Sequence, residues 1–224
     1  MLALIDTCHA TREARGNLCA CLEPSRIARL RSVAGDLHLD AGAVLFRAGQ
    51  PADAVFGLRQ GMVMQTRRLA DGRRQVLSFH FPGDTIGLAD ERHGGDAVAL
   101  TRISLCRIPL EALDRDPDLA AQMRRIAERN LASALDHALA LGRMTAAERV
   151  GRFLQETWRR SGRPDDLHLP MRVADIADHL GLRPETVSRC FSDLRRQGVI
   201  GILHPTGIMD LPGTDRLARL FGQE

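Results

Sequence analysis

Residues 173–199 constrain the fold more than any other part of this 224-residue chain. Apolar side chains recur there at three- and four-residue steps, which predicts a short helix up to Leu180 and a second helix beginning near Pro184. Gly181 lies where the first helix must stop, at a turn that favours a positive φ angle. Proline is tolerated in the first turn of a helix, where a missing N–H costs little. This pattern is typical of a helix-turn-helix.

The second predicted helix has an apolar face and a polar face. Val187, Phe191 and Leu194 are expected in the core. The remaining side chains are of the types that read base edges and phosphates in a major groove. These candidate DNA-binding residues are Glu185, Thr186, Ser188, Arg189, Ser192 and Arg195. The alternative is an ordinary helical hairpin, which the agreement of turn chemistry with periodicity disfavours.

The composition is that of an ordinary globular protein, with 44% hydrophobic and 26% charged residues. The net charge of +3 is too small to establish nucleic-acid binding by itself. No run approaches the ~18 apolar residues that span a bilayer, and the N-terminus lacks a secretory pattern, so we expect a cytoplasmic protein without a membrane partner. Five cysteines in such a protein argue against a disulfide framework.

The texture of the sequence predicts an α+β fold in four parts. Residues 1–22 are a cysteine-bearing N-terminal segment. Residues 23–115 begin with a helix over 23–35 and continue as short alternating runs separated by glycines, which is typical of a β-roll. Residues 116–142 predict one long helix, and residues 143–224 contain the helix-turn-helix.

Three local signals refine this division. Asp71-Gly72 lies between alternating runs and predicts a β-hairpin. Thr145 with Glu148 three residues later predicts a capping box at the start of a helix. Residues 199–211 predict a two-stranded wing after the helix-turn-helix.

The long helix carries an apolar stripe that something must cover. Its members recur at three- and four-residue steps and are Ala127, Leu131, Ala134, Ala138 and Leu141. The two candidate covers are the β-roll of the same chain and a second copy of the helix. Because small alanines permit close approach of two helices, we favour the seam of a homodimer.

The order of β-roll, long helix and winged helix-turn-helix resembles the CRP/FNR family of bacterial transcription regulators. The motifs that carry the likeness are Gly42-Ala-Val-Leu-Phe-Arg-Ala-Gly49, Arg59-Gln-Gly61, Phe81-Pro-Gly-Asp84-Thr-Ile-Gly87, Ala147-Glu-Arg-Val150 and the segment 173–199. The resemblance covers nearly the whole chain. It implies a cyclic-nucleotide-binding-like β-roll, a dimerisation helix, and a transcription regulator whose partners are double-stranded DNA and RNA polymerase.

The FNR/FixK-like branch fits best. Glu185, Ser188 and Arg189 match the Glu-x-x-Ser-Arg pattern with which FNR-like proteins read TTGAT-type half-sites. The chemistry agrees, because Arg189 can fork onto guanine O6 and N7 while Glu185 can accept from a cytosine amine. A twofold dimer would then read a palindrome with half-sites about one helical turn apart.

No cyclic nucleotide is expected. The stretch comparable to the phosphate-binding site of the family's cAMP receptors is 87–97, and it has no Arg-Ser or Arg-Thr pair. Asp90, Glu91 and Asp96 would repel a phosphate diester there, although Arg92 is a candidate phosphate ligand.

FNR-like sensors hold an oxygen-labile [4Fe–4S] cluster on three N-terminal cysteines and one cysteine of the β-roll. Cys106 matches the β-roll ligand. Cys8 and Cys19 keep two of the N-terminal positions, Thr11 stands at the third, and Cys21 is an additional thiol at a cramped spacing. The resemblance therefore implies Cys8, Cys19, Cys21 and Cys106 as metal ligands and an oxygen or redox signal.

Other hypotheses for the signal and the function stay open. A clusterless FixK-like regulator would be controlled by abundance or by thiol oxidation, with Cys190 in the second predicted helix as the candidate redox residue. A haem would need histidine ligands from among His9, His38, His80 and His93. An enzyme is a remote alternative, since the chain has no phosphate loop with lysine, nucleophile elbow or HExxH pair. A stand-alone cyclic-nucleotide-binding module is equally remote.

Overall fold

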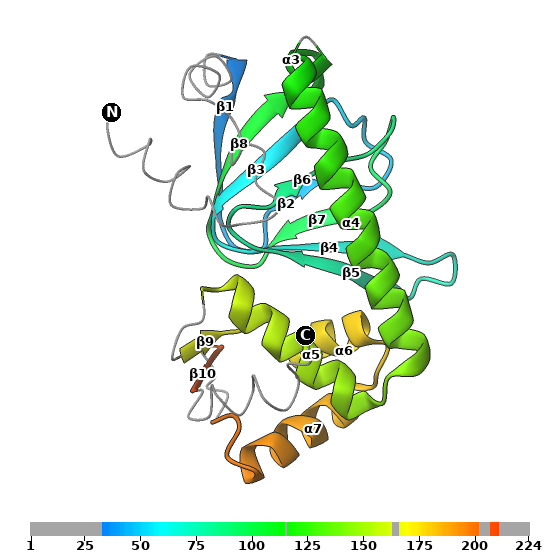
Figure 1. Cartoon of the computed structure of the whole chain (residues 1–224), viewed down its shortest axis with the longest axis vertical. Coiled ribbons are helices and arrows are strands. Elements are labelled where there is room, and N and C mark those ends of the chain that lie inside the picture. Colours follow the sequence, from blue (N-terminus) through cyan, green and yellow to red (C-terminus); the bar gives the residue numbers. More distant parts are fainter. Residues whose placement is uncertain (1–32, 115, 163–165, 202–206, 211–224) are drawn as a thin grey trace. The chain divides into compact units, whose positions relative to one another are not determined.

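The structure, a computed structural model, describes residues 33–114, 116–162, 166–201 and 207–210. The chain divides into one unit up to Ala134 and another from Leu135 onward, and each is described by itself (Figure 1). The predicted segment 1–22 and nearly all of the predicted helix over 23–35 lie outside the described residues. The α+β class is confirmed, with strands in the first unit and mostly helices in the second.

Two four-stranded antiparallel sheets form the N-terminal unit (Figure 1). The first sheet has the order β1 (Gly35–Leu39), β8 (Ile103–Pro109), β3 (Ala54–Gln60) and β6 (Thr85–Ile86). The second has the order β2 (Val44–Phe46), β7 (Asp96–Ala99), β4 (Val63–Arg68) and β5 (Arg74–His80). Strands that are remote in sequence lie side by side, as the prediction of a β-roll requires.

Two apolar clusters hold this unit together. Side chains from both sheets meet between them, including Phe46 of β2 and Phe56 of β3. Alternation along each strand turns every second side chain the other way. On the outer face of the first sheet, α3 (Leu110–Asp114) and the beginning of α4 (Pro117–Arg143) cover a second cluster. Its members are Val55, Ile108, Leu113, Leu119, Met123 and Ile126.

The hairpin at Asp71-Gly72 is confirmed. It joins β4 to β5, whose last and first residues pair across the turn. Gly72 has a φ of 84°, in the region that glycine adopts without a Cβ penalty. The Asp71 carboxylate accepts a hydrogen bond from the Arg73 amide at 3.0 Å, which closes the turn locally.

The C-terminal unit contains the end of α4 and the helices α5 (Ala146–Arg160), α6 (Val173–Leu180) and α7 (Pro184–Arg196). The capping box at the start of α5 is confirmed, since the Thr145 amide donates to Glu148 Oε2 at 2.7 Å and the Thr145 hydroxyl accepts from the Glu148 amide at 3.4 Å. Gly181 ends α6 in the left-handed region, with a φ of 61°. The predicted helix-turn-helix is therefore present.

The predicted wing differs in its pairing. Within the described residues, 199–201 form no strand, and β10 (Ile208–Asp210) pairs with β9 (Asp166–His168) instead. Leu167 and Met209 stand opposite each other in this ladder, and both are fully buried. A three-residue strand is too short to show an alternating pattern, so β9 was missed.

No described helix has the length and apolar character needed to cross a membrane.

Candidate functional site

Helix α7 presents the predicted DNA-reading residues on its outer face. Val187, Phe191 and Leu194 are buried, as predicted, and fix the rotation of the helix about its axis. Glu185, Ser188 and Arg189 are exposed, and their three- and four-residue spacing puts them on one face. Among the described residues, neither Glu185 nor Arg189 has a hydrogen-bond or ion-pair partner for its side chain. Both are therefore available to a ligand.

The other three candidates on α7 differ in availability. Thr186 is half-buried, whereas Ser192 and Arg195 are exposed. The Ser192 hydroxyl donates back to the Ser188 carbonyl at 3.0 Å, a bond that occupies it within the helix. Arg195 lies in the last turn and suits a phosphate more than a base edge.

Arg149 of α5 fixes the helices that support α7. Its Nη1 donates to the Leu180 carbonyl at 2.9 Å, at the C-terminal end of α6. Its Nε donates to the Met144 carbonyl at 3.0 Å, just before α5 begins. A cation at carbonyls left open by a helix end is stabilising. The sequence offered one signal for this residue, its place in the motif Ala147-Glu-Arg-Val150.

A stacked pair of imidazoles joins the end of α4 to α6. The rings of His137 and His179 have centroids 4.3 Å apart and planes inclined by 14°. Phe153 approaches His179 edge-on, with a centroid distance of 6.1 Å. Burial lowers the pKa of His137, and the nearby charges of Arg149 and Arg152 act in the same direction. A hydrogen bond with the His179 backbone opposes this shift, but burial is the larger effect and favours the neutral form of His137.

Cys190 lies on α7 between an exposed arginine and a buried phenylalanine, and it is itself half-buried. Burial raises the pKa of the Cys190 thiol, and the charge of Asp193 adds to this, while Arg189 opposes it. Because the thiolate is the reactive species, these surroundings slow oxidation of Cys190.

Cys106 lies in the middle of the first sheet. On β8 it stands opposite Asp36 of β1 on one side and Gly57 of β3 on the other. Residues directly opposite in an antiparallel pair share one face of the sheet. Because Gly57 has no side chain, that side of Cys106 is left open, and an added Cβ would lie 3.9 Å from the Cys106 Cβ.

Arg59 crosses the sheet beside Cys106. It starts on β3 and its Nη1 reaches Asp36 Oδ1 on β1 at 2.8 Å, so the side chain must pass over β8. Its Nη2 donates to the carbonyl of Leu105, the residue before the cysteine, at 3.1 Å. A register irregularity between Leu58 and Gln60 makes Arg59 the bulged residue and re-aims its side chain.

One donor of this arginine is unsatisfied. The Arg59 side chain is only 11% exposed, and its Nε is buried with no hydrogen-bond partner in the described part of the chain. A buried cationic N–H without an acceptor costs free energy, and an anionic sulfur would satisfy it. The surroundings of Cys106 thus fit a thiolate that binds a cluster. Cys8, Cys19 and Cys21 lie outside the described residues, within which no three metal-binding side chains converge.

The outer face of α4 carries large apolar side chains that nothing in the described chain covers. Leu131, Leu135 and Leu139 are 61%, 62% and 58% exposed, one turn apart along the helix. The predicted seam residues Ala127, Ala134 and Ala138 are exposed next to them. Leu141 is half-buried instead, and an added Cβ on Gly181 would lie 3.3 Å from its Cδ2. It therefore packs within its own chain. Leu135 and Leu139 are exposed apolar residues that the predicted stripe did not include.

The arginine of the segment 87–97 already makes a hydrogen bond within the chain. Arg92 donates from Nη1 to the Gly49 carbonyl at 2.7 Å. Asp96 accepts from the Ala48 amide at 2.8 Å, and Asp90 and Glu91 are exposed. The absence of a cyclic nucleotide stays a prediction.

Comparison with known proteins agrees with this geometry. The family described as cyclic nucleotide-binding domain matches residues 36–115, and the Crp-like helix-turn-helix domain matches residues 148–220. The nitrogen fixation regulation protein FixK of Bradyrhizobium diazoefficiens is 33% identical over 197 residues, which are 84% of this chain and 83% of that protein. The chain belongs to the CRP/FNR family, in its FixK-like branch.

Other members of the family are similar over most of their length. The solved structure of FixK2 from Bradyrhizobium japonicum has a TM-score of 0.78 and 34% identity, and covers 86% of this chain and 99% of its own. The transcriptional activatory protein AadR of Rhodopseudomonas palustris is 34% identical over 200 residues, 85% of this chain and 83% of that protein. These relatives are transcription regulators, and the helix-turn-helix makes this chain a DNA-binding regulator of the same type.

Proposed function

We propose that this protein acts as a homodimer that reads a TTGAT-like palindrome through α7 and responds to oxygen or redox state through a [4Fe–4S] cluster. The observation that carries the DNA-reading part is that Glu185, Ser188 and Arg189 are exposed on one face of a helix whose rotation the buried side chains fix. A regulator of this kind works in the cytoplasm, beside the DNA and the RNA polymerase that it engages.

Base reading by Arg189 gives the direct test. A bidentate arginine on guanine contributes about 1–3 kcal/mol of discrimination, so Arg189→Ala should weaken binding to the palindrome by roughly 5- to 150-fold. Binding to random DNA should change little. Arg159→Ala, which removes an exposed arginine of α5 paired with Glu156, is the matched control. Equal losses on specific and random DNA would refute base reading.

The homodimer rests on the exposed leucines of α4. A row of three exposed leucines flanked by alanines is self-complementary, and a twofold axis through it makes the same patch meet its own copy. Twofold symmetry also matches a palindromic DNA site. The seam that we propose consists of Ala127, Leu131, Ala134, Leu135, Ala138 and Leu139.

The sensor part rests on the surroundings of Cys106. A [4Fe–4S] cluster on four thiolates would supply an oxygen-labile group. Cys106 would be one ligand, Cys8, Cys19 and Cys21 the others, and the open Nε of Arg59 would donate to an anionic sulfur. A relative from Haemophilus influenzae, 30% identical over 191 residues, bears the name anaerobic regulatory protein. That name is consistent with a response to oxygen.

A clusterless regulator controlled by abundance or by thiol oxidation is the second candidate. The observation in its favour is the position of Cys190 next to Arg189 on α7, where an oxidised sulfur would place charge beside the DNA-reading face. Burial raises the pKa of the same thiol and makes it slow to oxidise, so we rank this candidate below the cluster.

A further inference from the structure

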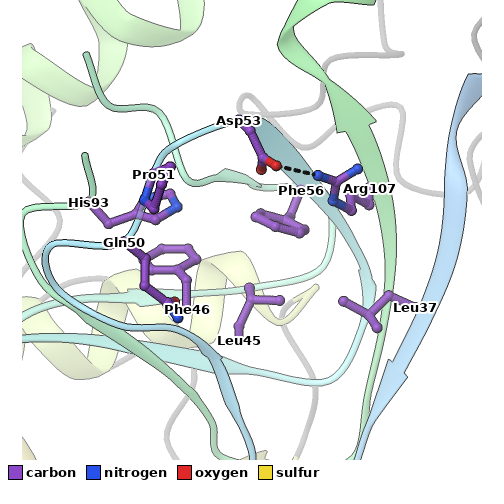
Figure 2. A pocket seen from close by; sticks show the side chains of 9 residues that line it. All are labelled: Leu37, Leu45, Phe46, Gln50, Pro51, Asp53, Phe56, His93 and Arg107. Atoms are coloured by element: carbon purple, nitrogen blue, oxygen red, sulfur yellow. Dashed lines mark ion pairs between the residues drawn. The ribbon is translucent and has the colours of Figure 1, made fainter. Parts of the chain in front are cut away.

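A cavity of about 350 Å³ opens between the two sheets of the N-terminal unit (Figure 2). Leu37 of β1 and Phe56 of β3 line it from the first sheet, and Leu45 and Phe46 of β2 line it from the second. Its volume is within the range of small-molecule sites. None of these residues takes part in the DNA-reading face, the dimer seam or the surroundings of Cys106.

Three of the nine side chains that line the cavity are aromatic rings, Phe46, Phe56 and His93. The ring centroids of Phe46 and Phe56 lie 6.1 Å apart with planes inclined by 30°. The imidazole of His93 stacks on the ring of Phe46. Their centroids lie 3.7 Å apart and their planes are inclined by 12°. Rings at such separations leave faces and edges that favour another planar ring.

His93 provides an unused hydrogen-bonding group in this apolar site. The residue is 5% exposed, but its ring nitrogens are not fully enclosed, so they stay open to a hydrogen-bond partner in the cavity. Burial lowers the pKa of His93, so the ring is neutral and presents one donor and one acceptor. A ring nitrogen that is open to the cavity can exchange a hydrogen bond with the hydroxyl of a ligand.

The charges at the cavity cancel. Arg107 Nη2 lies 2.9 Å from Asp53 Oδ2, and Figure 2 shows this ion pair beside Phe56. An anionic ligand would find no free cation there, and a cationic ligand no free carboxylate. Bringing an unpaired charge into the apolar interior is strongly unfavourable. The lining therefore selects an uncharged molecule.

We propose that this cavity binds a small, uncharged aromatic molecule that carries a hydroxyl group. Phe46 and Phe56 contact its ring, and the His93 imidazole exchanges a hydrogen bond with its hydroxyl. This site is separate from the proposed cluster and does not depend on it.

Calorimetric titration of the full chain with three probes tests the proposal. Phenol should bind with a dissociation constant on the order of 1 mM or tighter. Toluene, which keeps the ring and lacks the hydroxyl, should bind about fivefold more weakly. Benzoate, which adds a charge, should bind more weakly than either. No binding of phenol, or a preference for benzoate, would overturn the proposal.

Two variants locate the site. His93→Phe keeps a ring stacked on Phe46 and should reduce phenol affinity to that of toluene, whereas His38→Gln, a change on the exposed face of β1, should leave it unchanged. Leu45→Trp fills the cavity and should abolish binding of both. Unchanged phenol affinity in folded His93→Phe would overturn the assignment. If a variant does not fold, the order of the affinities of phenol, toluene and benzoate for the unaltered protein still tests the proposal.

Discussion

The two described cysteines are similarly buried but have different surroundings. Cys106 and Cys190 are both half-buried; Arg59 bonds the residue before Cys106, and Arg189 precedes Cys190 in the sequence. At Cys106 the arginine is Arg59, held over the sheet by two contacts and left with a buried, unsatisfied N–H. At Cys190 the arginine is Arg189, which points to solvent, while burial and Asp193 raise the pKa of the thiol.

The difference bears on which of the two cysteines suits the proposed cluster. Proximity of an arginine in sequence, as at Arg189-Cys190, does not stabilise a thiolate when the guanidinium faces water. Proximity across strands would stabilise a thiolate at Cys106, because Arg59 reaches over β8 in a low-dielectric setting. The strand register therefore supports the proposal of metal binding at the sheet, and the exposed face of α7 supports the proposal of DNA reading.

The largest effect is expected from replacing the two cysteines in turn. Cys106→Ser should abolish iron binding, since it removes a thiolate ligand. Cys190→Ser should retain the iron content and the DNA affinity of the unaltered protein. Iron analysis of anaerobically purified protein measures both. Retention of full iron by Cys106→Ser would break the distinction between the two sites.

A large effect is also expected at the exposed face of α4. Leu135→Asp places a charge in the middle of the proposed seam and should weaken dimerisation by at least about 100-fold. The matched control is Leu69→Asp, at an exposed leucine in the β4–β5 turn, which should leave the dimer intact. Sedimentation equilibrium gives the dissociation constants. An unchanged dissociation constant in Leu135→Asp would contradict the proposed dimer interface on α4.

An intermediate effect is expected at Arg59. Arg59→Gln removes the donor beside Cys106 and should speed loss of the cluster in air by roughly tenfold. Arg102→Gln, at an exposed arginine paired with Asp40, is the control. Decay of the visible absorbance after exposure to air measures the rate, and thermal unfolding checks that both variants are folded. Equal decay in the two variants would mean that Arg59 acts only on the fold.

The smallest effect concerns pH and the C-terminal unit. Because the folded-state pKa of His137 is lowered from 6.5, the unfolded chain binds its proton first as the pH falls. Stability from this residue is therefore fully present above pH 6.5 and is lost as the pH falls below that value toward the folded-state pKa. His137→Phe keeps the stack on His179 and should flatten the decline in unfolding temperature. An unchanged slope would remove His137 as its source.

Local signals in the sequence predicted the C-terminal unit well. Gly181 ends α6 because glycine tolerates its left-handed φ, and Thr145 with Glu148 caps α5 through bonds three residues apart. The face of α7 followed from periodicity alone, since Val187, Phe191 and Leu194 are all buried. Each of these features depends on neighbours within one helical turn, which a single sequence contains.

Features set by distant contacts were missed. β9 exists because Leu167 pairs with Met209, more than forty positions away. The apolar residues of α4 extend around much of the helix, so periodicity did not separate Leu135 from Leu141. Packing separates them, because Leu141 lies against the turn at Gly181. Arg59 stands in the motif Arg59-Gln-Gly61, but the motif does not predict its role, which depends on a bulge and on the register of three strands.

The central claim is that the face around Cys106 holds a cluster, and chemical analysis tests it most directly. The full chain would be purified without oxygen and assayed for iron and acid-labile sulfide. The account predicts a brown protein with about four irons and four sulfides per chain, lost together on exposure to air. A colourless protein without iron, which still binds the palindrome, would contradict it.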